Sequence, residues 1–191
     1  MTDSKKTAFK CIIVLVLITV ICCSLLAVLN DLLYVSSKER TDRVINSIYG
    51  TEMEYQMETV DQTKVNSSYG EVLEIYSLAD GNKLYKTKGY NGFKNGTVSL
   101  WIVVGYENGT PDKITKVILA EFEKQTIMSK ISGVYQTYVD VSKDYYTTGG
   151  IFTVDKEDTN NIYNIVTGAT KSTNAANNAV NVLIDYVWGG K

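Results

Sequence analysis

The sequence predicts an α+β fold, in which one N-terminal transmembrane helix precedes a single domain of mostly antiparallel sheet with packed helices. Three observations predict it: a long apolar run near the start, two pairs of strand-like segments joined by turns, and a helix-like segment at the end. Strands that follow one another through short turns pair antiparallel, and a later helix can cover one face of their sheet. At 191 residues, the chain has room for one domain and little more.

The apolar run extends from Ala8 to Leu29, and its only charged residue is Lys10. Roughly 20 apolar residues span the hydrocarbon core of a bilayer, so this length predicts a transmembrane helix. The run is too long for a typical signal peptide and lacks a small-residue cleavage site, which predicts an uncleaved anchor. Residues 1–7 then form an N-terminal tail, and residues 30–50 form a helical stalk. The apolar side of this stalk contains Leu33, Val44, Ile45 and Ile48.

All three cysteines of the chain, Cys11, Cys22 and Cys23, lie in the apolar run. As small apolar residues they fit a membrane helix, and the segment after the run can form no disulfide. Positive charges flank the run on both sides, so they do not decide its orientation. Because a domain without thiols suits the outside of the cell, we expect the N-terminus inside and residues 51–191 outside the plasma (inner) membrane.

Two hairpins are predicted in the domain. The first joins Glu71–Tyr76 to Lys83–Lys88 through an Asp-Gly-Asn turn. The second joins Thr97–Tyr106 to Lys113–Glu121 through a turn cluster that contains the proline. The later segments are an ambiguous one at Gln125–Ile131, a strand at Val134–Val141, a polar loop at Asp155–Asn160, a short strand at Asn161–Val166 and a helix at Thr173–Trp188.

The composition excludes several classes of function. The net charge of −2 gives no sign of a nucleic-acid surface, so no nucleic-acid partner is expected. The chain contains no histidine, which removes the commonest metal ligand and general base. The sequence therefore predicts neither a metal site nor a catalytic residue.

A turn of small residues connects the last predicted strand to the last predicted helix. A helix start offers unpaired backbone N–H groups and the positive end of the helix dipole, so it suits a phosphate. Small residues let the backbone come close to such a ligand. The candidates for this role are Thr167, Gly168, Ala169, Thr170, Lys171, Ser172 and Thr173.

Two other interpretations of this turn can be weighed. Ser172 or Thr173 could simply cap a core helix that begins after a tight turn. A nucleotide-binding P-loop is excluded, because its two glycines would have to stand at Ile165 and Thr170.

The stretch Asn164-Ile165-Val166-Thr167-Gly168-Ala169-Thr170 resembles the motif D-x-x-[ST]-G-A-[TS] of the FMN-binding domain family. The best-known members of that family are the RnfG and NqrC subunits of the Rnf and Nqr electron-transfer complexes. In the family the last threonine carries FMN through a phosphodiester bond, which a dedicated flavin transferase makes from FAD. The resemblance therefore implies that Thr170 is the attachment point.

The order of elements is also similar to that of the family. Its members have one membrane helix and then a small extracytoplasmic α+β domain, with a G-Y-x-G stretch before the central hairpin. Here that stretch is Gly89-Tyr90-Asn91-Gly92. The resemblance implies an FMN site formed by Gly89, Tyr90, Gly92 and the residues from Thr167 to Thr173.

The resemblance also implies a function. The chain would be a membrane-anchored electron carrier, the flavin-carrying G subunit of an Rnf-type ion-translocating ferredoxin:NAD oxidoreductase. It would be an electron-transfer subunit of this translocase rather than an enzyme by itself, with other integral membrane subunits and a flavin transferase as partners. An NqrC-like subunit, a stand-alone membrane-tethered flavin shuttle and a non-redox binding module on a stalk remain as alternatives.

Three positions depart from the family pattern. Asn164 stands where the family has an aspartate, so a transferase that reads this carboxylate would modify the chain more slowly. The stretch Glu123–Ser129 lacks the proline and glycines of the ETPGLG sequence that helps to wall the flavin in the family. Phe122 lies near the place of a histidine that the family often has.

Overall fold

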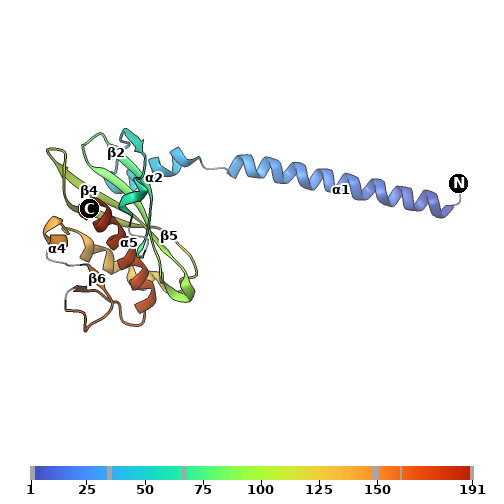
Figure 1. The fold of residues 1–191 in the computed structure, drawn as a ribbon. Helices are drawn as coiled ribbons and strands as arrows, with labels where there is room; N and C mark the ends of the chain where they lie inside the picture. Colours follow the sequence, from blue (N-terminus) through green and yellow to red (C-terminus); the bar gives the residue numbers. More distant parts are fainter. Residues whose placement is uncertain (1–2, 34–35, 66–67, 148–150, 160, 190–191) are drawn as a thin grey trace. The chain divides into compact units, whose positions relative to one another are not determined.

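The computed structural model describes the chain apart from residues 1–2, 34–35, 66–67, 148–150, 160 and 190–191 (Figure 1). The chain divides into two compact units, Met1–Glu52 and Met53–Lys191. The predicted α+β class is confirmed, because an apolar helix comes first and a mostly antiparallel sheet with packed helices follows.

The first unit consists of two helices, α1 (Asp3–Leu33) and α2 (Ser37–Tyr49). The segment Phe9–Asp31 of α1 has a mean hydropathy of 3.3 and is, by length and composition, able to cross a membrane. Its side chains are exposed to the surroundings. The predicted stalk is helical in both α1 and α2, and a serine cap at Ser36 marks the start of α2.

The second unit is built on a five-stranded antiparallel sheet in the order β1-β2-β3-β4-β5. Its strands are β1 (Tyr55–Glu58), β2 (Gly70–Leu78), β3 (Lys83–Gly89), β4 (Val98–Glu107) and β5 (Thr110–Phe122). Both predicted hairpins are confirmed. The second turn is tighter than predicted, because Asn108 and Gly109 adopt φ values of 51° and 77°, as in a two-residue type I′ turn. The strand β5 therefore continues through Pro111.

Short elements follow the sheet in sequence. They are α3 (Met128–Ile131), the 3₁₀ helix η3 (Ser132–Tyr138), α4 (Lys143–Thr147) and the parallel pair β6 (Phe152–Thr153) and β7 (Ile162–Tyr163). Two further 3₁₀ turns connect strands in the sequence: η1 (Gln62–Lys64) lies between β1 and β2, and η2 (Phe93–Asn95) lies between β3 and β4.

The predicted strand at Val134–Val141 is wrong, because most of this segment lies in η3. From Met128 to Val141 the buried positions follow a helical spacing, at Met128, Ile131, Val134, Tyr135, Tyr138 and Val141. This helical spacing is hard to recognise when residues 134–141 are considered without the residues before them. The predicted strand at Asn161–Val166 is also shorter than expected and contains only the two residues of β7.

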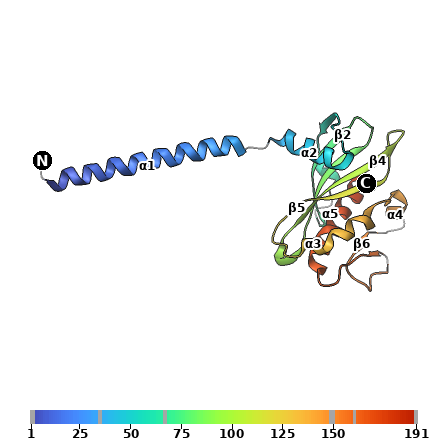
Figure 2. The same cartoon turned by 180° about the vertical axis from the view of Figure 1, so that it is seen from behind.

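The last helix, α5 (Thr170–Trp188), lies on one face of the sheet against β2, β3 and β4, and Figures 1 and 2 show it there together with α3, α4 and β6. Small residues permit this packing. A Cβ atom on Gly89 of β3 would lie 1.9 Å from the Ala175 carbonyl oxygen of α5. Since Gly89 has no side chain, the N-terminal half of α5 can rest directly on the sheet.

Candidate functional site

The turn before α5 has a geometry that explains its glycine. The Ala169 N–H donates to the Val166 carbonyl at 2.9 Å, and Gly168 adopts a φ of 79°. A β-turn with a positive φ at its third residue is of type II and favours glycine at that position. Nothing lies within 4 Å of a Cβ atom placed on Gly168, so there is room for a side chain. The glycine is favoured by its backbone conformation and not by lack of space.

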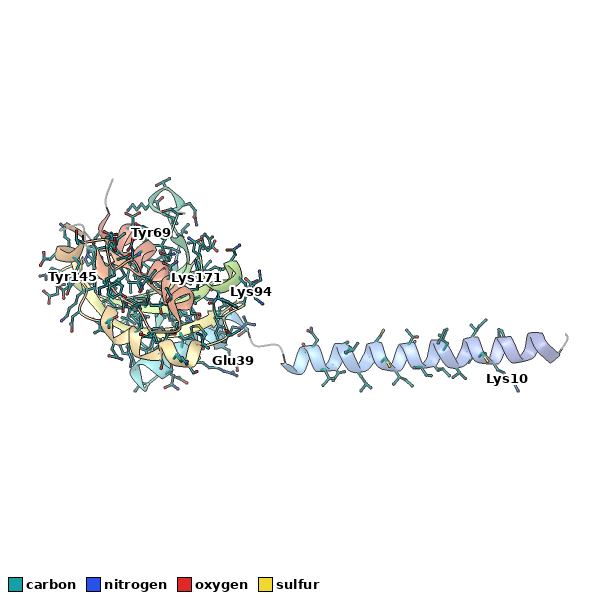
Figure 3. All side chains as sticks on the ribbon, turned by 90° about the horizontal axis from the view of Figure 1, so that it is seen from below. Lys10, Glu39, Tyr69, Lys94, Tyr145 and Lys171 are labelled. Atoms are coloured by element: carbon teal, nitrogen blue, oxygen red, sulfur yellow. The ribbon has the colours of Figure 1, made fainter. Side chains whose placement is uncertain are left out.

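The helix α5 begins at Thr170, three residues earlier than predicted. Ala169 is its N-cap residue and makes no side-chain capping hydrogen bond. The amides of Thr170, Lys171 and Ser172 have no carbonyl partner within the helix. Because the side chains of Thr170 and Lys171 are exposed, a hydroxyl, a cation and the positive end of a 19-residue helix meet at this place (Figure 3).

The next two hydroxyls of the motif point inward. Ser172 and Thr173 are only 2% and 0% exposed. The Thr173 hydroxyl donates to the Ala169 carbonyl at 3.0 Å and accepts the Val166 N–H at 3.3 Å. The idea that either residue is the N-cap is therefore wrong, since both lie inside the helix. Thr173 instead fastens the turn to the helix, while Thr167 and Gly168 stay exposed at its surface.

The G-Y-x-G stretch is held against the same helix. The side chain of Asn178 donates to the Tyr90 carbonyl at 3.0 Å, and Asn174 donates to the Asn91 carbonyl at 3.2 Å. These two asparagines are four residues apart, so they lie on one face of α5. The structure thus holds the G-Y-x-G stretch against the helix that follows the Asn164–Thr170 motif.

Gly89 and Tyr90 have different surroundings. Gly89 is covered by α5. Partial burial, and after it the Glu71 carboxylate, raise the pKa of the Tyr90 phenol. Glu71 belongs to β2, so the Tyr90 side chain lies near that strand, while the Tyr90 carbonyl makes the contact with α5.

Gln125 joins three segments at the start of α5, a role that its place in the sequence does not indicate. Its side-chain oxygen accepts the Phe93 N–H at 3.1 Å and the Ser172 hydroxyl at 2.8 Å. Its side-chain nitrogen donates to the Phe93 carbonyl at 3.4 Å and to the Glu123 carbonyl at 2.8 Å. Gln125 is 7% exposed and lies in the stretch where the family has its ETPGLG sequence.

Asn164, where the family has an aspartate, lies in a buried polar network. Its side-chain nitrogen donates to the Thr137 hydroxyl at 3.0 Å and to the Asn177 side-chain oxygen at 3.1 Å. Asn177 in turn donates to the Asn164 carbonyl at 2.9 Å and accepts the Tyr138 hydroxyl at 2.7 Å. A carboxylate has no hydrogen to donate, so the amide of Asn164 suits this network and an ionised aspartate does not.

Four asparagines of α5 hold loops in place, and the sequence analysis did not identify them. Asn174 and Asn178 hold the G-Y-x-G stretch, Asn177 holds Asn164, and Asn181 holds Phe152. The signal that could have found them is their spacing, because asparagine at such density is unfavourable inside a helix without tertiary partners.

Exposed aromatic and basic side chains surround the start of α5. Phe93 is 37% exposed, and the Lys94 ammonium lies 5.4 Å from the centre of its ring. Lys124, next to Gln125 in the chain, is exposed as well. Figure 3 labels Lys94 on the η2 loop and Lys171 at the start of α5. The site therefore offers cations and an aromatic face around an exposed hydroxyl.

Within the described part of the chain, no three His, Cys, Asp or Glu side chains are grouped so that they could hold a metal ion. Comparison with protein-family models, with curated proteins and with solved structures gives no match to this chain. The resemblance to the FMN-binding domain family therefore stays a prediction that rests on the motif and on the order of the elements.

Proposed function

We propose that this protein is a membrane-anchored electron carrier that holds FMN through a phosphodiester bond to Thr170. One observation carries the proposal: the Thr170 hydroxyl is exposed at the first residue of an uncapped helix, directly after a glycine turn of type II. An attachment point needs a hydroxyl that a transferase can reach, and a phosphodiester needs an environment that favours its negative charge.

The residues around Thr170 suit FMN in two respects. The free N–H groups of the first helical turn would stabilise the phosphodiester charge by about 0.3–1 kcal/mol, and the Lys171 ammonium would add to this. The exposed ring of Phe93 would offer an apolar surface to the isoalloxazine, since aromatic rings stack at offset geometry. When bound, FMN supplies the one- and two-electron chemistry, and the protein supplies position and electrostatics.

Attachment requires one group transfer. The Thr170 oxygen would form a bond to the flavin-side phosphorus of FAD while the bond from that phosphorus to the AMP oxygen breaks. AMP would leave, and the proton of the Thr170 hydroxyl would be released. No oxidation or reduction takes place in this step, so FAD is the only co-reactant that the transferase needs.

The location in the cell belongs to the same proposal. The apolar segment Phe9–Asp31 would serve as a single-pass anchor in the plasma (inner) membrane, with residues 53–191 on the extracytoplasmic side. A diffusible cofactor would be lost from that side of the membrane, and a covalent bond prevents the loss. The role that we propose is the G subunit of an Rnf-type ion-translocating complex, which passes electrons between other integral membrane subunits.

The proposal is tested by co-expressing the full chain with a flavin transferase and measuring flavin fluorescence after denaturing electrophoresis. We expect a fluorescent band for the chain with its own sequence, no band for Thr170→Val, and a weaker band for Thr170→Ser. Thr159→Val, which changes an exposed threonine outside the motif, serves as the matched control and should label normally. If the chain with its own sequence shows no fluorescence, the covalent bond is contradicted. If FMN binds but can be extracted, only the covalent bond is contradicted, and the role as electron carrier stands.

A further inference from the structure

We propose that Gln125 is the positioning residue of the Thr170 site, because it holds the loop that carries Phe93 against the first turn of α5. This inference rests on the proposed function of Thr170. It adds that the place of the acceptor hydroxyl is set by a side chain 45 positions away in the sequence, outside the motif that resembles the family.

The hydrogen bonds of Gln125 fill its capacity. An amide side chain has two donor hydrogens and an oxygen with two lone pairs. In Gln125 the oxygen accepts from Phe93 and Ser172, and the nitrogen donates to Phe93 and Glu123. Loss of this buried side chain would remove the acceptor of the Phe93 N–H and of the Ser172 hydroxyl, whereas the Phe93 and Glu123 carbonyls would still accept the N–H groups of Gly96 and Thr97.

The loops are shaped to admit this side chain. A Cβ atom on Gly92 or on Gly96 would lie 2.6 Å from the Gln125 side-chain nitrogen, closer than side-chain atoms pack. Lys94 and Asn95, between these glycines, adopt φ values of 51° and 56°, and Lys124 adopts 59°. Such conformations are costly for residues other than glycine and persist only where the surroundings enforce them. The contacts with Gln125 hold this loop together with the backbone hydrogen bonds that Gly92, Gly96 and Thr97 donate.

Each segment that Gln125 ties carries an exposed lysine next to the tied residue. Lys94 follows Phe93, Lys124 follows Glu123, and Lys171 precedes Ser172. Ser172 is also two residues from Thr170, within the same helical turn. Gln125 thereby sets how far the Phe93 ring and these cations stand from the hydroxyl that receives the flavin phosphate.

A second buried amide provides a matched control. Asn181 is 1% exposed, accepts the Phe152 N–H at 2.9 Å and donates to the Phe152 carbonyl at 2.8 Å. It therefore clamps a loop phenylalanine in the same way as Gln125 clamps Phe93. Asn181 lies three turns further along α5, and the segment that it holds is β6 and not the loop that carries Phe93.

The experiment compares Gln125→Met with Asn181→Leu in the full chain, purified in detergent and incubated with a flavin transferase and FAD. Both substitutions keep the side-chain shape and remove the hydrogen bonds. We expect Gln125→Met to slow covalent labelling of Thr170 by about ten- to a hundredfold, since misplacing a reacting group by about 1 Å has such an effect. Asn181→Leu should leave the labelling rate unchanged.

Hydrogen exchange of the same samples gives a readout that does not depend on the flavin. Gln125→Met should raise exchange in residues 91–96 and at the start of α5, and Asn181→Leu should raise it around residue 152 instead. Ser172→Ala removes only the bond between α5 and Gln125, so it should slow labelling less than Gln125→Met and gives a readout even where Gln125→Met folds poorly.

The outcomes separate this inference from the proposed function. Normal labelling of a folded Gln125→Met, or unchanged exchange in residues 91–96, overturns the role of Gln125 and leaves Thr170 as the acceptor. If the chain without any substitution takes up no flavin, the proposed function is contradicted. In that case the exchange pattern alone decides whether Gln125 holds the Phe93 loop against α5.

Discussion

The starts of α2 and α5 satisfy the same physical requirement in opposite ways. At α2 the Ser36 hydroxyl accepts the Glu39 N–H at 3.1 Å, and Glu39 places a carboxylate in the first turn. At α5 no side chain caps the helix, its first turn contains no acidic residue, and Lys171 is exposed there. The start of α2 is capped by its own neighbouring residues, whereas the start of α5 leaves its N–H groups and the positive end of its dipole available to an anion.

The comparison teaches where the stability of an open helix start comes from. The cap of α2 is local, because its partners are three residues apart. The start of α5 is held by tertiary contacts instead, through Ser172 with Gln125, Thr173 with the turn, and Asn177 with Asn164. Buried hydrogen bonds below the first turn thus let the turn itself remain without a cap.

The largest effect is expected when the support of α5 is broken at Asn164. Asn164→Asp removes two donated hydrogen bonds and brings a carboxylate toward the Thr137 and Asn177 oxygen atoms. We expect it to lower the free energy of unfolding by about 2–3 kcal/mol, as for lost bonds that leave buried polar groups unpaired. Denaturant unfolding of the full chain in detergent measures this.

Asn108→Asp is the control for that change, because Asn108 is exposed and both Asn-Gly and Asp-Gly suit its turn. Its free energy of unfolding should stay within about 0.5 kcal/mol of the unmodified chain. If Asn164→Asp is equally mild and labels faster, a transferase reads the carboxylate and the amide network is not the reason for Asn164.

A smaller effect is expected when the local cap is removed. Ser36→Ala should weaken the first turn of α2 by about 1 kcal/mol, because the Glu39 N–H loses its acceptor. Hydrogen exchange of residues 38–41 should rise, while flavin labelling of Thr170 stays the same. Ser37→Ala, one residue further along and without a capping role, should leave this exchange unchanged. A loss of labelling in Ser36→Ala would mean that the two helix starts are coupled.

The smallest change in stability, and one of opposite sign, is expected at Lys171. Lys171→Glu gives α5 the acidic first turn that α2 has, which should raise the free energy of unfolding by about 0.3–1 kcal/mol. The same carboxylate should slow the labelling of Thr170, because it repels the incoming phosphate. Lys156→Glu, in the exposed loop after β6, should do neither. A Lys171→Glu chain that is less stable, or that labels normally, would contradict an anion-accepting helix start.

Several features of the protein follow from the sequence by itself because their causes are local. The length and apolarity of Ala8–Leu29 suffice to predict α1. Alternating residues and turn signals predict both hairpins, and the glycine at position 168 marks the turn before α5. Each of these predictions uses a pattern within one continuous segment of the chain, which a single sequence displays directly.

Only the tertiary structure decided how the start of α5 is arranged. Ser172 and Thr173 have the composition of caps, yet they turn inward, because Gln125 and the turn backbone provide their hydrogen-bond partners. The asparagines of α5 were missed for the same reason. Most buried polar side chains have a hydrogen-bond partner, and for Asn178 of α5 that partner lies 88 positions away in the sequence. The local pattern could name the exposed hydroxyl of Thr170, but the fold alone determines what holds it there.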